Sequence, residues 1–180
     1  MDDTNFSYAV DNWPPSAYMN VYTCGISNGY AGFSSAPDGT AAKDNIVMSY
    51  EWVGEDYLDK GAILAHEVGH WLGLPHTFNG NSCSKDDGLV VNDTPNTDQA
   101  STNYISSLGY SERELCDPSF DVSVVNRCGE PVMYTNNMDY ALGTCRKYFT
   151  KGQASEMRGY LESSTSPPFV AVFPCSSRTM

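Results

Sequence analysis

The chain has 180 residues, with 10 Lys and Arg against 22 Asp and Glu, for a formal net charge of −12. An acidic surface repels phosphate, which excludes nucleic acid as a partner, and the absence of any run of about 18 apolar residues excludes a membrane-spanning helix. A hydrophobic content of 41% indicates a globular protein whose length fits one domain.

The six cysteines lie at scattered spacings and form no Cys-x-x-Cys pair. An even number of such cysteines indicates disulfides and an oxidising compartment, so we expect a secreted, extracellular protein. We also expect it to be a monomer. The alternative is a set of reduced thiols in the core.

The first part of the chain predicts two strands. Residues 1–17 are polar and indicate an irregular lead-in, and residues 18–23 predict a strand. Residues 24–40 are dense in Gly, Ser, Pro and Asn and predict a long loop. A second strand is expected at residues 45–50, followed by a helix from about 59 to 72.

The predicted helix leads into the motif around which the chain is organised. Residues 64–76 contain the pattern His-Glu-x-x-His-x-x-Gly-x-x-His, with its fixed positions at His66, Glu67, His70, Gly73 and His76. His66 and His70 are four residues apart, so on a helix they share one face and can bind one zinc ion. Gly73 can end the helix in a left-handed conformation, which lets His76 return as a third ligand. Three protein ligands plus water is the catalytic form of zinc, and a helix with surface histidines is the alternative.

The middle of the chain changes character. Residues 79–103 are rich in Asn, Asp, Ser and Thr and predict a loop. Its oxygen-rich side chains indicate either a calcium site or a solvated acidic loop, and the residues concerned are Asp86, Asp87, Asp93 and Thr94. A short helix is expected around Ser111–Leu115, with Ser111 as N-cap and Glu114 completing a capping box.

The last predicted helix begins with a second capping box. The segment Thr150-Lys-Gly-Gln153 has the capping-box pattern, and the helix it opens runs to about Ser163. The spacing of Ala154, Met157 and Leu161 predicts that this face is buried. The remaining residues are Ser- and Pro-rich and then apolar, and we expect a tail there.

The zinc motif, followed directly by Thr77-Phe78, resembles the metzincin clan of zinc peptidases and within it the pappalysin family of ulilysin-like enzymes. The resemblance extends from about Tyr18 to about Leu161. It implies an α+β fold with a small mixed sheet, a zinc-bearing active-site helix, a disulfide-stapled, loop-rich lower subdomain and a C-terminal helix. We therefore expect one catalytic domain over residues 1–180, divided into an upper subdomain (1–76), a lower subdomain (77–165) and a tail (166–180).

The resemblance also implies roles for individual residues. Glu67 would act as general base and then general acid toward a zinc-bound water that attacks the scissile carbonyl. The segment Asn137-Met-Asp-Tyr140 resembles the Met-turn of the family. Met138 would form the floor of the zinc site without ligating, and Tyr140 would donate its phenol to the oxyanion. Residues 46–50 would form the edge strand that pairs with an extended substrate, with an ordinary core strand as the alternative.

The family's disulfides and calcium site map onto this chain as well. Its two crossed bridges imply Cys83–Cys128 and Cys116–Cys145, which leaves Cys24–Cys175 as the simplest third pair. The segment Asp93-Thr-Pro95 is similar to the family's calcium-site sequence.

The chain departs from the pattern at two points. Ulilysin-like enzymes favour Arg or Lys after the cut through an Asp that here is Thr144, so a broader or more apolar pocket is expected. The family places more residues before the zinc helix than the 65 that precede His66, so we expect an upper subdomain that lacks some strands and a supporting helix.

These inferences make a secreted zinc endopeptidase, acting on a protein or peptide substrate, the leading interpretation. The first alternative is a truncated or non-catalytic metzincin module that binds zinc or a protein partner without turnover. The second is a zinc hydrolase that acts on something other than peptides.

Overall fold

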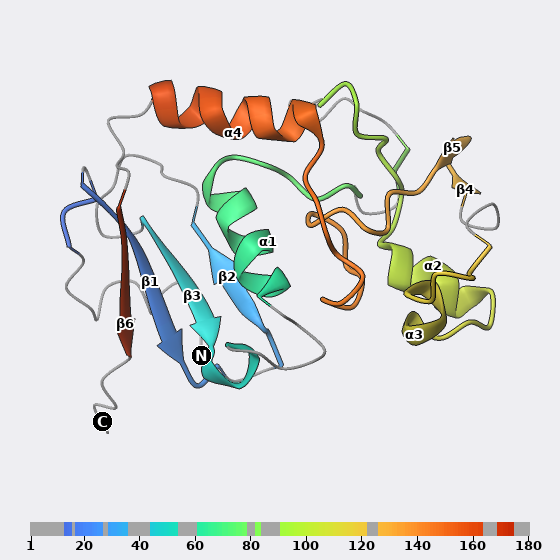
Figure 1. The fold of residues 1–180 in the computed structure, drawn as a ribbon, viewed down its shortest axis with the longest axis horizontal. Coiled ribbons are helices and arrows are strands. Elements are labelled where there is room, and N and C mark those ends of the chain that lie inside the picture. The colour runs from blue at the N-terminus through green and yellow to red at the C-terminus, as the bar shows by residue number, and fades with distance from the viewer. Residues whose placement is uncertain are drawn as a thin grey trace.

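A computed structural model shows an α+β fold in which a helix packs on a sheet and a second group of helices lies beside it (Figure 1). The structure describes residues 13–15, 17–26, 29–35, 44–53, 61–78, 82–83, 91–121, 126–163 and 169–174. Its strands are β1 (Tyr18–Cys24), β2 (Gly32–Ser34), β3 (Asn45–Ser49), β4 (Asn126–Arg127), β5 (Glu130–Pro131) and β6 (Phe169–Pro174). Its α-helices are α1 (Ala62–Trp71), α2 (Ser101–Ser107), α3 (Glu112–Leu115) and α4 (Lys151–Ser163). No helix in these ranges is long and apolar enough to cross a bilayer.

The larger sheet is mixed, with the strand order β2-β3-β1-β6. Strand β1 is parallel to both β3 and β6, and β2 is antiparallel to β3. The strands predicted for β1 and β3 are confirmed, except that Tyr50 belongs to a short 3₁₀ turn at Tyr50–Trp52 instead of to β3.

Two segments of the sheet differ from the sequence-based expectation. Strand β2 lies in the predicted loop of residues 24–40, and β6 lies in the segment expected to be a tail. Because β2 pairs with the outer side of β3, the prediction that residues 46–50 form the edge strand is wrong. All five residues of β3 are buried, as expected of the alternative, a core strand.

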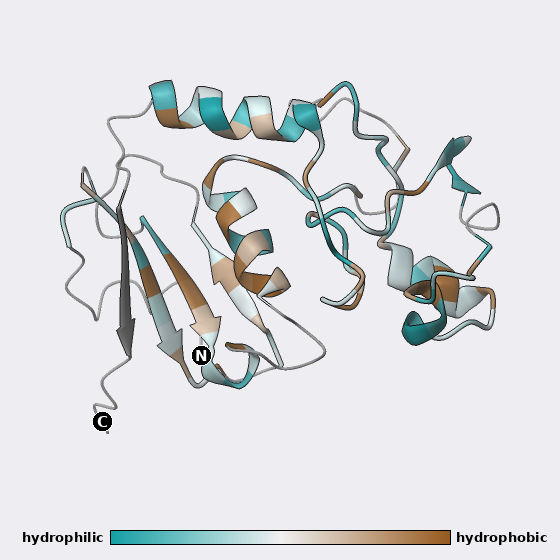
Figure 2. Cartoon of the chain, viewed as in Figure 1, coloured by the Kyte–Doolittle hydropathy of each residue, from teal (hydrophilic) through white to brown (hydrophobic). Residues whose placement is uncertain are grey.

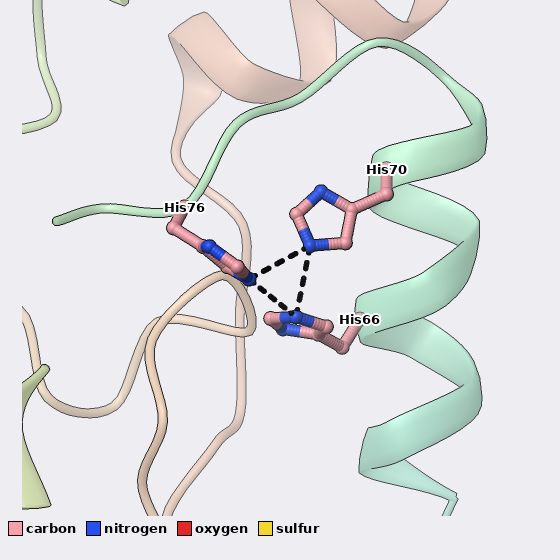
Figure 3. A group of neighbouring side chains, drawn as sticks. All are labelled: His66, His70 and His76. Atoms are coloured by element: carbon pink, nitrogen blue, oxygen red, sulfur yellow. Dashed lines mark hydrogen bonds between the residues drawn. The ribbon is translucent and has the colours of Figure 1, made fainter. Parts of the chain in front are cut away.

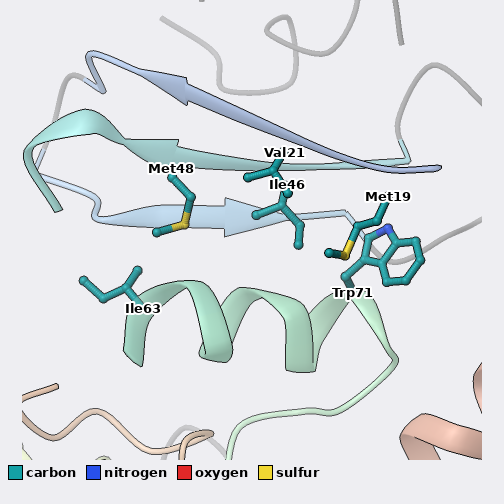
Figure 4. Close-up of a cluster of buried hydrophobic side chains, with 6 residues drawn as sticks. All are labelled: Met19, Val21, Ile46, Met48, Ile63 and Trp71. Carbon is teal, nitrogen blue, oxygen red and sulfur yellow. The ribbon is translucent and has the colours of Figure 1, made fainter. Parts of the chain in front are cut away.

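The core of the sheet region lies between the sheet and α1. Hydrophobic side chains from both layers interdigitate there (Figure 4), namely Met19, Val21, Ile46, Met48, Ile63 and Trp71. Figure 2 shows the same concentration of hydrophobic residues on β3 and α1, in contrast to the mainly hydrophilic α4. Complete burial stabilises each such side chain by roughly 1.5–3 kcal/mol. The indole Nε1 of Trp71 donates to the carboxylate of Asp44 at 2.6 Å, which anchors the end of α1 next to β3.

Helix α1 ends as the motif predicts. Gly73 has a φ of +87°, a left-handed conformation that a glycine adopts without strain. The amide of Gly73 donates to His70 O and that of Leu74 donates to Gly69 O, each at 2.9 Å, which closes the helix and reverses the chain. The predicted start of the helix, residues 59–60, lies outside the described residues.

The second region contains α2, α3 and the small β4-β5 sheet around its own buried cluster (Figure 1), made of Ile105, Leu115, Val132, Ala141 and Cys145. The capping box predicted for α3 is confirmed, because Ser111 Oγ accepts from Glu114 N while the Glu114 carboxylate accepts from Ser111 N. Helix α2 is not predicted from the sequence, which indicates a loop up to residue 103.

Two disulfides staple this region. They join Cys83 to Cys128 and Cys116 to Cys145, the two pairs that the family resemblance implies. Cys24 is disulfide-bonded as well, and Cys175, the partner expected for it, lies outside the described residues.

Helix α4 begins with the predicted capping box but buries only part of the predicted face. Thr150 N donates to Gln153 Oε1 at 2.9 Å, and Gln153 N donates to Thr150 Oγ1 at 3.0 Å. Ala154 and Leu161 are exposed, contrary to expectation, while Met157 is partly buried against a core cluster that contains Met138, and Gln153 is buried. The helix docks through polar contacts, because the amide of Gln153 exchanges hydrogen bonds with Asn136 at 2.7 and 3.2 Å. Hydrophobic spacing therefore identifies the contact of Met157 but misses the polar contacts of Gln153.

Candidate active site

Three imidazoles, of His66, His70 and His76, converge on one point (Figure 3). Helix α1 presents His66 and His70 from consecutive turns, and the chain reversal at Gly73 brings back His76. The Nε2 atoms of His66 and His70 are 3.0 Å apart, those of His70 and His76 are 2.9 Å apart, and those of His66 and His76 are 3.2 Å apart.

Backbone carbonyls fix the orientation of two of these rings. His66 Nδ1 lies 2.6 Å from Asn137 O, and His70 Nδ1 lies 2.7 Å from Leu74 O. A carbonyl only accepts, so each Nδ1 carries the proton and donates, and each Nε2 is left with a lone pair. Two lone pairs cannot hydrogen-bond to each other, so the Nε2 atoms of His66 and His70 together suit a cation placed between them.

Burial also keeps the three imidazoles neutral. It lowers the pKa of His66 to about 3 and that of His76 to about 4, with further lowering from neighbouring histidines, and it lowers the pKa of His70. Neutral imidazole is the form that ligates zinc. Zinc with nitrogen ligands at about 2.0–2.1 Å in a tetrahedron would separate them by roughly 3.3 Å, close to the observed spacing. The donor set therefore fits a zinc ion at this point.

Glu67 lies next to this group and is buried, with 6% of its surface exposed. Burial raises the pKa of Glu67 to about 7, while the hydroxyl of Ser34 and the charge of Arg146 oppose that rise. A Cβ on Gly32 would lie 3.2 Å from Glu67 Cγ, so β2 passes directly over this side chain. Ser34 is not predicted from the sequence, because nothing local in a Gly- and Ser-rich segment distinguishes it.

The expected Met-turn lies beneath the imidazoles. Met138 is fully buried, and its sulfur fills the space beside Gly69 in α1. Tyr140 is half exposed, and its ring centroid is 4.7 Å from that of His76 and 5.5 Å from that of His66. Burial raises the pKa of the Tyr140 phenol, as does the nearby Glu67 carboxylate, so the phenol stays protonated.

Asp139 connects the Met-turn to α2, a role that sequence analysis misses. Its carboxylate accepts from Ser101 N at 3.0 Å and from Ser101 Oγ at 2.5 Å. This carboxylate binds an amide of the first turn of α2, where the preceding Ala100 has no side chain that could cap the helix. The second region is thereby attached to the segment that positions His66.

The residues expected to bind calcium are only partly described. Asp86 and Asp87 lie outside the described residues. The carboxylate of Asp93 accepts from Thr150 Oγ1 at 2.7 Å and from Gly152 N at 2.8 Å, so it binds the first turn of α4. Thr94 Oγ1 lies 3.0 Å from Thr150 Oγ1 in the same cluster.

Comparison with known proteins gives consistent matches. The model of the Peptidase M43 family, described as pregnancy-associated plasma protein-A, matches residues 2–162. An extracellular metalloprotease of Aspergillus fumigatus is 30% identical over 161 residues, which cover 87% of this chain and 44% of that protein. An extracellular metalloprotease of Colletotrichum graminicola is 38% identical over 100 residues, which cover 56% of this chain and 31% of that protein. The chain thus spans less than half the length of these relatives.

Two solved structures of mirolysin also match this chain. The structure of mature mirolysin of Tannerella forsythia in complex with a cleaved peptide superposes with a TM-score of 0.63 at 30% identity. That match covers 82% of this chain and 53% of the mirolysin chain. The structure of mirolysin in complex with compound 9 gives a TM-score of 0.64 at 30% identity, and the match covers 86% of this chain and 56% of the mirolysin chain.

Proposed function

The chain belongs to the pappalysin family, peptidase family M43, and from this premise we propose that it is a zinc-dependent endopeptidase that acts outside the cell. The observation that carries the proposal is the convergence of three neutral imidazoles on one point beside a buried carboxylate. The names of the fungal relatives support extracellular action, and the disulfides agree with an oxidising compartment.

His66, His70 and His76 would hold the zinc ion. When bound, zinc supplies a Lewis acid that lowers the pKa of water and polarises a carbonyl oxygen. The carboxylate of Glu67 takes the proton of the attacking water and passes it to the leaving amine. The phenol of Tyr140, whose raised pKa keeps its proton in place, donates a hydrogen bond to the oxyanion that forms on the substrate.

An extended peptide is the substrate that the sheet favours. Strand β2 pairs with β3 on one side and forms the edge of the described sheet, and it passes directly over Glu67. A free strand edge can bind an extended peptide through backbone hydrogen bonds. The mirolysin structure with a cleaved peptide is consistent with this class of substrate. We therefore assign the substrate-pairing role to Gly32–Ser34.

One set of measurements separates this proposal from its alternatives. The protein as purified is assayed for zinc content and for cleavage of a denatured protein, with and without a chelator and in the variant Glu67→Gln. Bound zinc with cleavage that both the chelator and the variant abolish supports the endopeptidase. Bound zinc without cleavage favours a non-catalytic module. Absence of zinc excludes both the zinc endopeptidase and the zinc-binding module.

Calcium binding at Asp93 and Thr94 stays a separate prediction. Oδ1 of the Asp93 carboxylate accepts from Thr150 Oγ1 and lies 3.4 Å from Thr94 Oγ1, while Oδ2 accepts from Gly152 N and retains a further lone pair for a cation. The carboxylate already has a structural role in capping α4, which by itself accounts for an acid at this position.

A further inference from the structure

Two of the three zinc-binding imidazoles are oriented by hydrogen bonds, and the third is not. Backbone carbonyls accept from Nδ1 of His66 and of His70, at 2.6 and 2.7 Å. Within the described part of the chain, Nδ1 of His76 has no such partner, and only its Nε2 lies within hydrogen-bond distance of another group. A ligand whose ring can turn binds a metal less tightly, because binding must then fix the ring. The orientation of His76 therefore depends on the side chains packed against its ring.

The side chain that covers this ring is Phe78. The centroid of its phenyl ring is 4.5 Å from the centroid of the His76 ring, and the two planes are only 7° apart. One face of the imidazole thus lies flat against the phenyl ring, a contact that attracts the two rings and restricts rotation of the imidazole. The Nε2 atom is at the edge of the imidazole, so the stack leaves it free to point at the metal position.

The same phenyl ring also contacts Tyr140. The centroids of Phe78 and Tyr140 are 4.9 Å apart with 66° between the planes, and those of Tyr140 and His76 are 4.7 Å apart with 71° between the planes. Each of the three rings therefore touches the other two. Removal of the Phe78 ring would release the third ligand and the phenol proposed to donate to the oxyanion at the same time.

The backbone next to Phe78 is held on both sides. Thr77 N donates to Met138 O in the Met-turn at 3.1 Å, and Thr97 N donates to Thr77 O at 2.9 Å. Phe78 itself forms an isolated β-bridge with Thr97. The phenyl ring therefore extends from a fixed backbone, and its position does not have to be found when the metal binds.

We propose that Phe78 is a positioning residue that orients the third zinc ligand, His76, and the phenol of Tyr140 through contacts between the rings. The inference rests on the proposed zinc peptidase function and extends it to a residue outside the ligand set. The phenyl ring offers no acidic proton and no lone pair, so it acts only through its shape and its attraction for the two neighbouring rings. It does for His76 what a backbone carbonyl does for each of the other two ligands.

Zinc affinity is the first test, because it needs no substrate. Phe78→Leu keeps a hydrophobic side chain but removes the flat ring, and we expect the Kd for zinc to rise roughly tenfold, as for loss of other groups that orient a metal ligand. Phe78→Tyr keeps the ring and should retain the affinity. The visible spectrum of the cobalt-substituted protein, which reports the geometry of the ligands, should change in Phe78→Leu and not in Phe78→Tyr.

Phe120→Leu is the matched control. Phe120 is also partly buried and also meets a tyrosine edge-on, since its ring centroid is 5.4 Å from that of Tyr110, but it packs in the cluster of the second region. This variant should leave the zinc affinity and the cobalt spectrum unchanged, even where it lowers the stability of the fold as much as Phe78→Leu does.

Cleavage of a peptide by the zinc-saturated variants tests the contact with Tyr140. Tyr140→Phe removes the hydroxyl that donates to the oxyanion, so it should lower kcat more than it raises KM. In Phe78→Leu the phenol is already displaced. Tyr140→Phe should therefore lower kcat by a smaller factor in that variant than in the unchanged protein.

The outcomes distinguish this inference from the proposed function. Zinc affinities and cobalt spectra that are the same in Phe78→Leu and Phe120→Leu overturn the inference and leave the peptidase intact. An equal effect of Tyr140→Phe with and without Phe78 overturns the part that concerns the phenol. Absence of zinc binding by the unchanged protein overturns the proposed function and this inference with it. Thermal unfolding is measured first, and Phe78→Met, whose flexible side chain fills irregular space, takes the place of Phe78→Leu if that variant does not fold.

Discussion

The sulfur of Met138 occupies the space that a β-carbon at position 69 would need, so only glycine fits between the two zinc-binding turns of α1. Gly69→Ala should therefore force Met138 out of its position below the imidazoles. We expect a loss of roughly 1–3 kcal/mol in the free energy of unfolding, as for other overpacked cores, together with weaker zinc binding. Urea denaturation and zinc titration measure the two effects.

Gly159→Ala is the matched control for that variant. Gly159 also lies within a helix, α4, but a β-carbon there meets no atom within 4 Å. Alanine should stabilise this helix by roughly 0.5–1 kcal/mol because it lowers the entropy of the unfolded chain. Equal effects of the two substitutions would contradict the packing of Met138 against α1.

Glu67→Gln should retain zinc but lose turnover. Glutamine keeps the shape of the side chain and cannot accept the proton, and general-base catalysis contributes roughly 10²–10⁴-fold to the rate. We expect a fall in kcat/KM of that size with unchanged zinc content. A variant that cleaves peptides at the rate of the unchanged protein would eliminate Glu67 as the proton acceptor.

The zinc-free protein should become less stable as the pH falls from 7 to 5. In the folded state the pKa values of His66 and His76 are about 3 and 4, against 6.5 for an ordinary histidine, so over this range the unfolded chain binds more protons. Binding of protons to the unfolded state lowers the stability of the fold, by about 1.4 kcal/mol per pH unit for each group at full difference.

Glu67 acts in the opposite direction over the same range. Its pKa rises from 4.5 to about 7 on folding, so the folded state binds the extra proton and gains stability as the pH falls. The histidines outnumber it, and we expect a net loss on the order of a few kcal/mol between pH 7 and 5. Glu67→Gln should steepen that loss. Urea unfolding of chelator-treated protein at several pH values is the measurement, and a stability that stays constant or increases toward pH 5 would refute the assignment.

Asp93→Ala should destabilise the protein even when calcium is absent. The carboxylate accepts hydrogen bonds from Thr150 and from the amide of Gly152 in the first turn of α4, where a negative charge is favourable. Thermal unfolding in the presence of a chelator should show a lower midpoint for the variant. Equal midpoints would remove the capping role, and a calcium-dependent shift seen only with Asp93 present would establish the metal site in addition.

The parts of the site that depend on local geometry are predicted from the sequence. The histidines at positions 66 and 70 share a face because of the helical period, and Gly73 reverses the chain because it accepts a positive φ. The capping boxes at Ser111 and Thr150 likewise involve residues only three positions apart. Such features need no knowledge of the rest of the fold.

The parts that depend on distant partners are not predicted. Strand β2 is only three residues long and forms because it pairs with β3. Helix α2 begins with residues of low helix propensity and forms nevertheless, because the Asp139 carboxylate binds its first turn. The prediction that β3 is the edge strand is wrong for the same reason, because the composition of the β2 segment is typical of a loop. The hydrogen bonds between the side chains of Gln153 and Asn136 likewise orient α4 in a way that its hydrophobic spacing does not predict.

The pairing of strand β1 determines when its two edges can be covered during protein synthesis. One of its edges pairs with β3, which leaves the ribosome soon after it, but its other edge pairs with β6, so that Tyr18 lies opposite Phe169. Until translation reaches Phe169, that side of β1 offers an unpaired row of amides and carbonyls to any neighbouring polypeptide. The nascent chain is thus exposed to aggregation through this edge until β6 is made, and a chaperone would protect it at that stage.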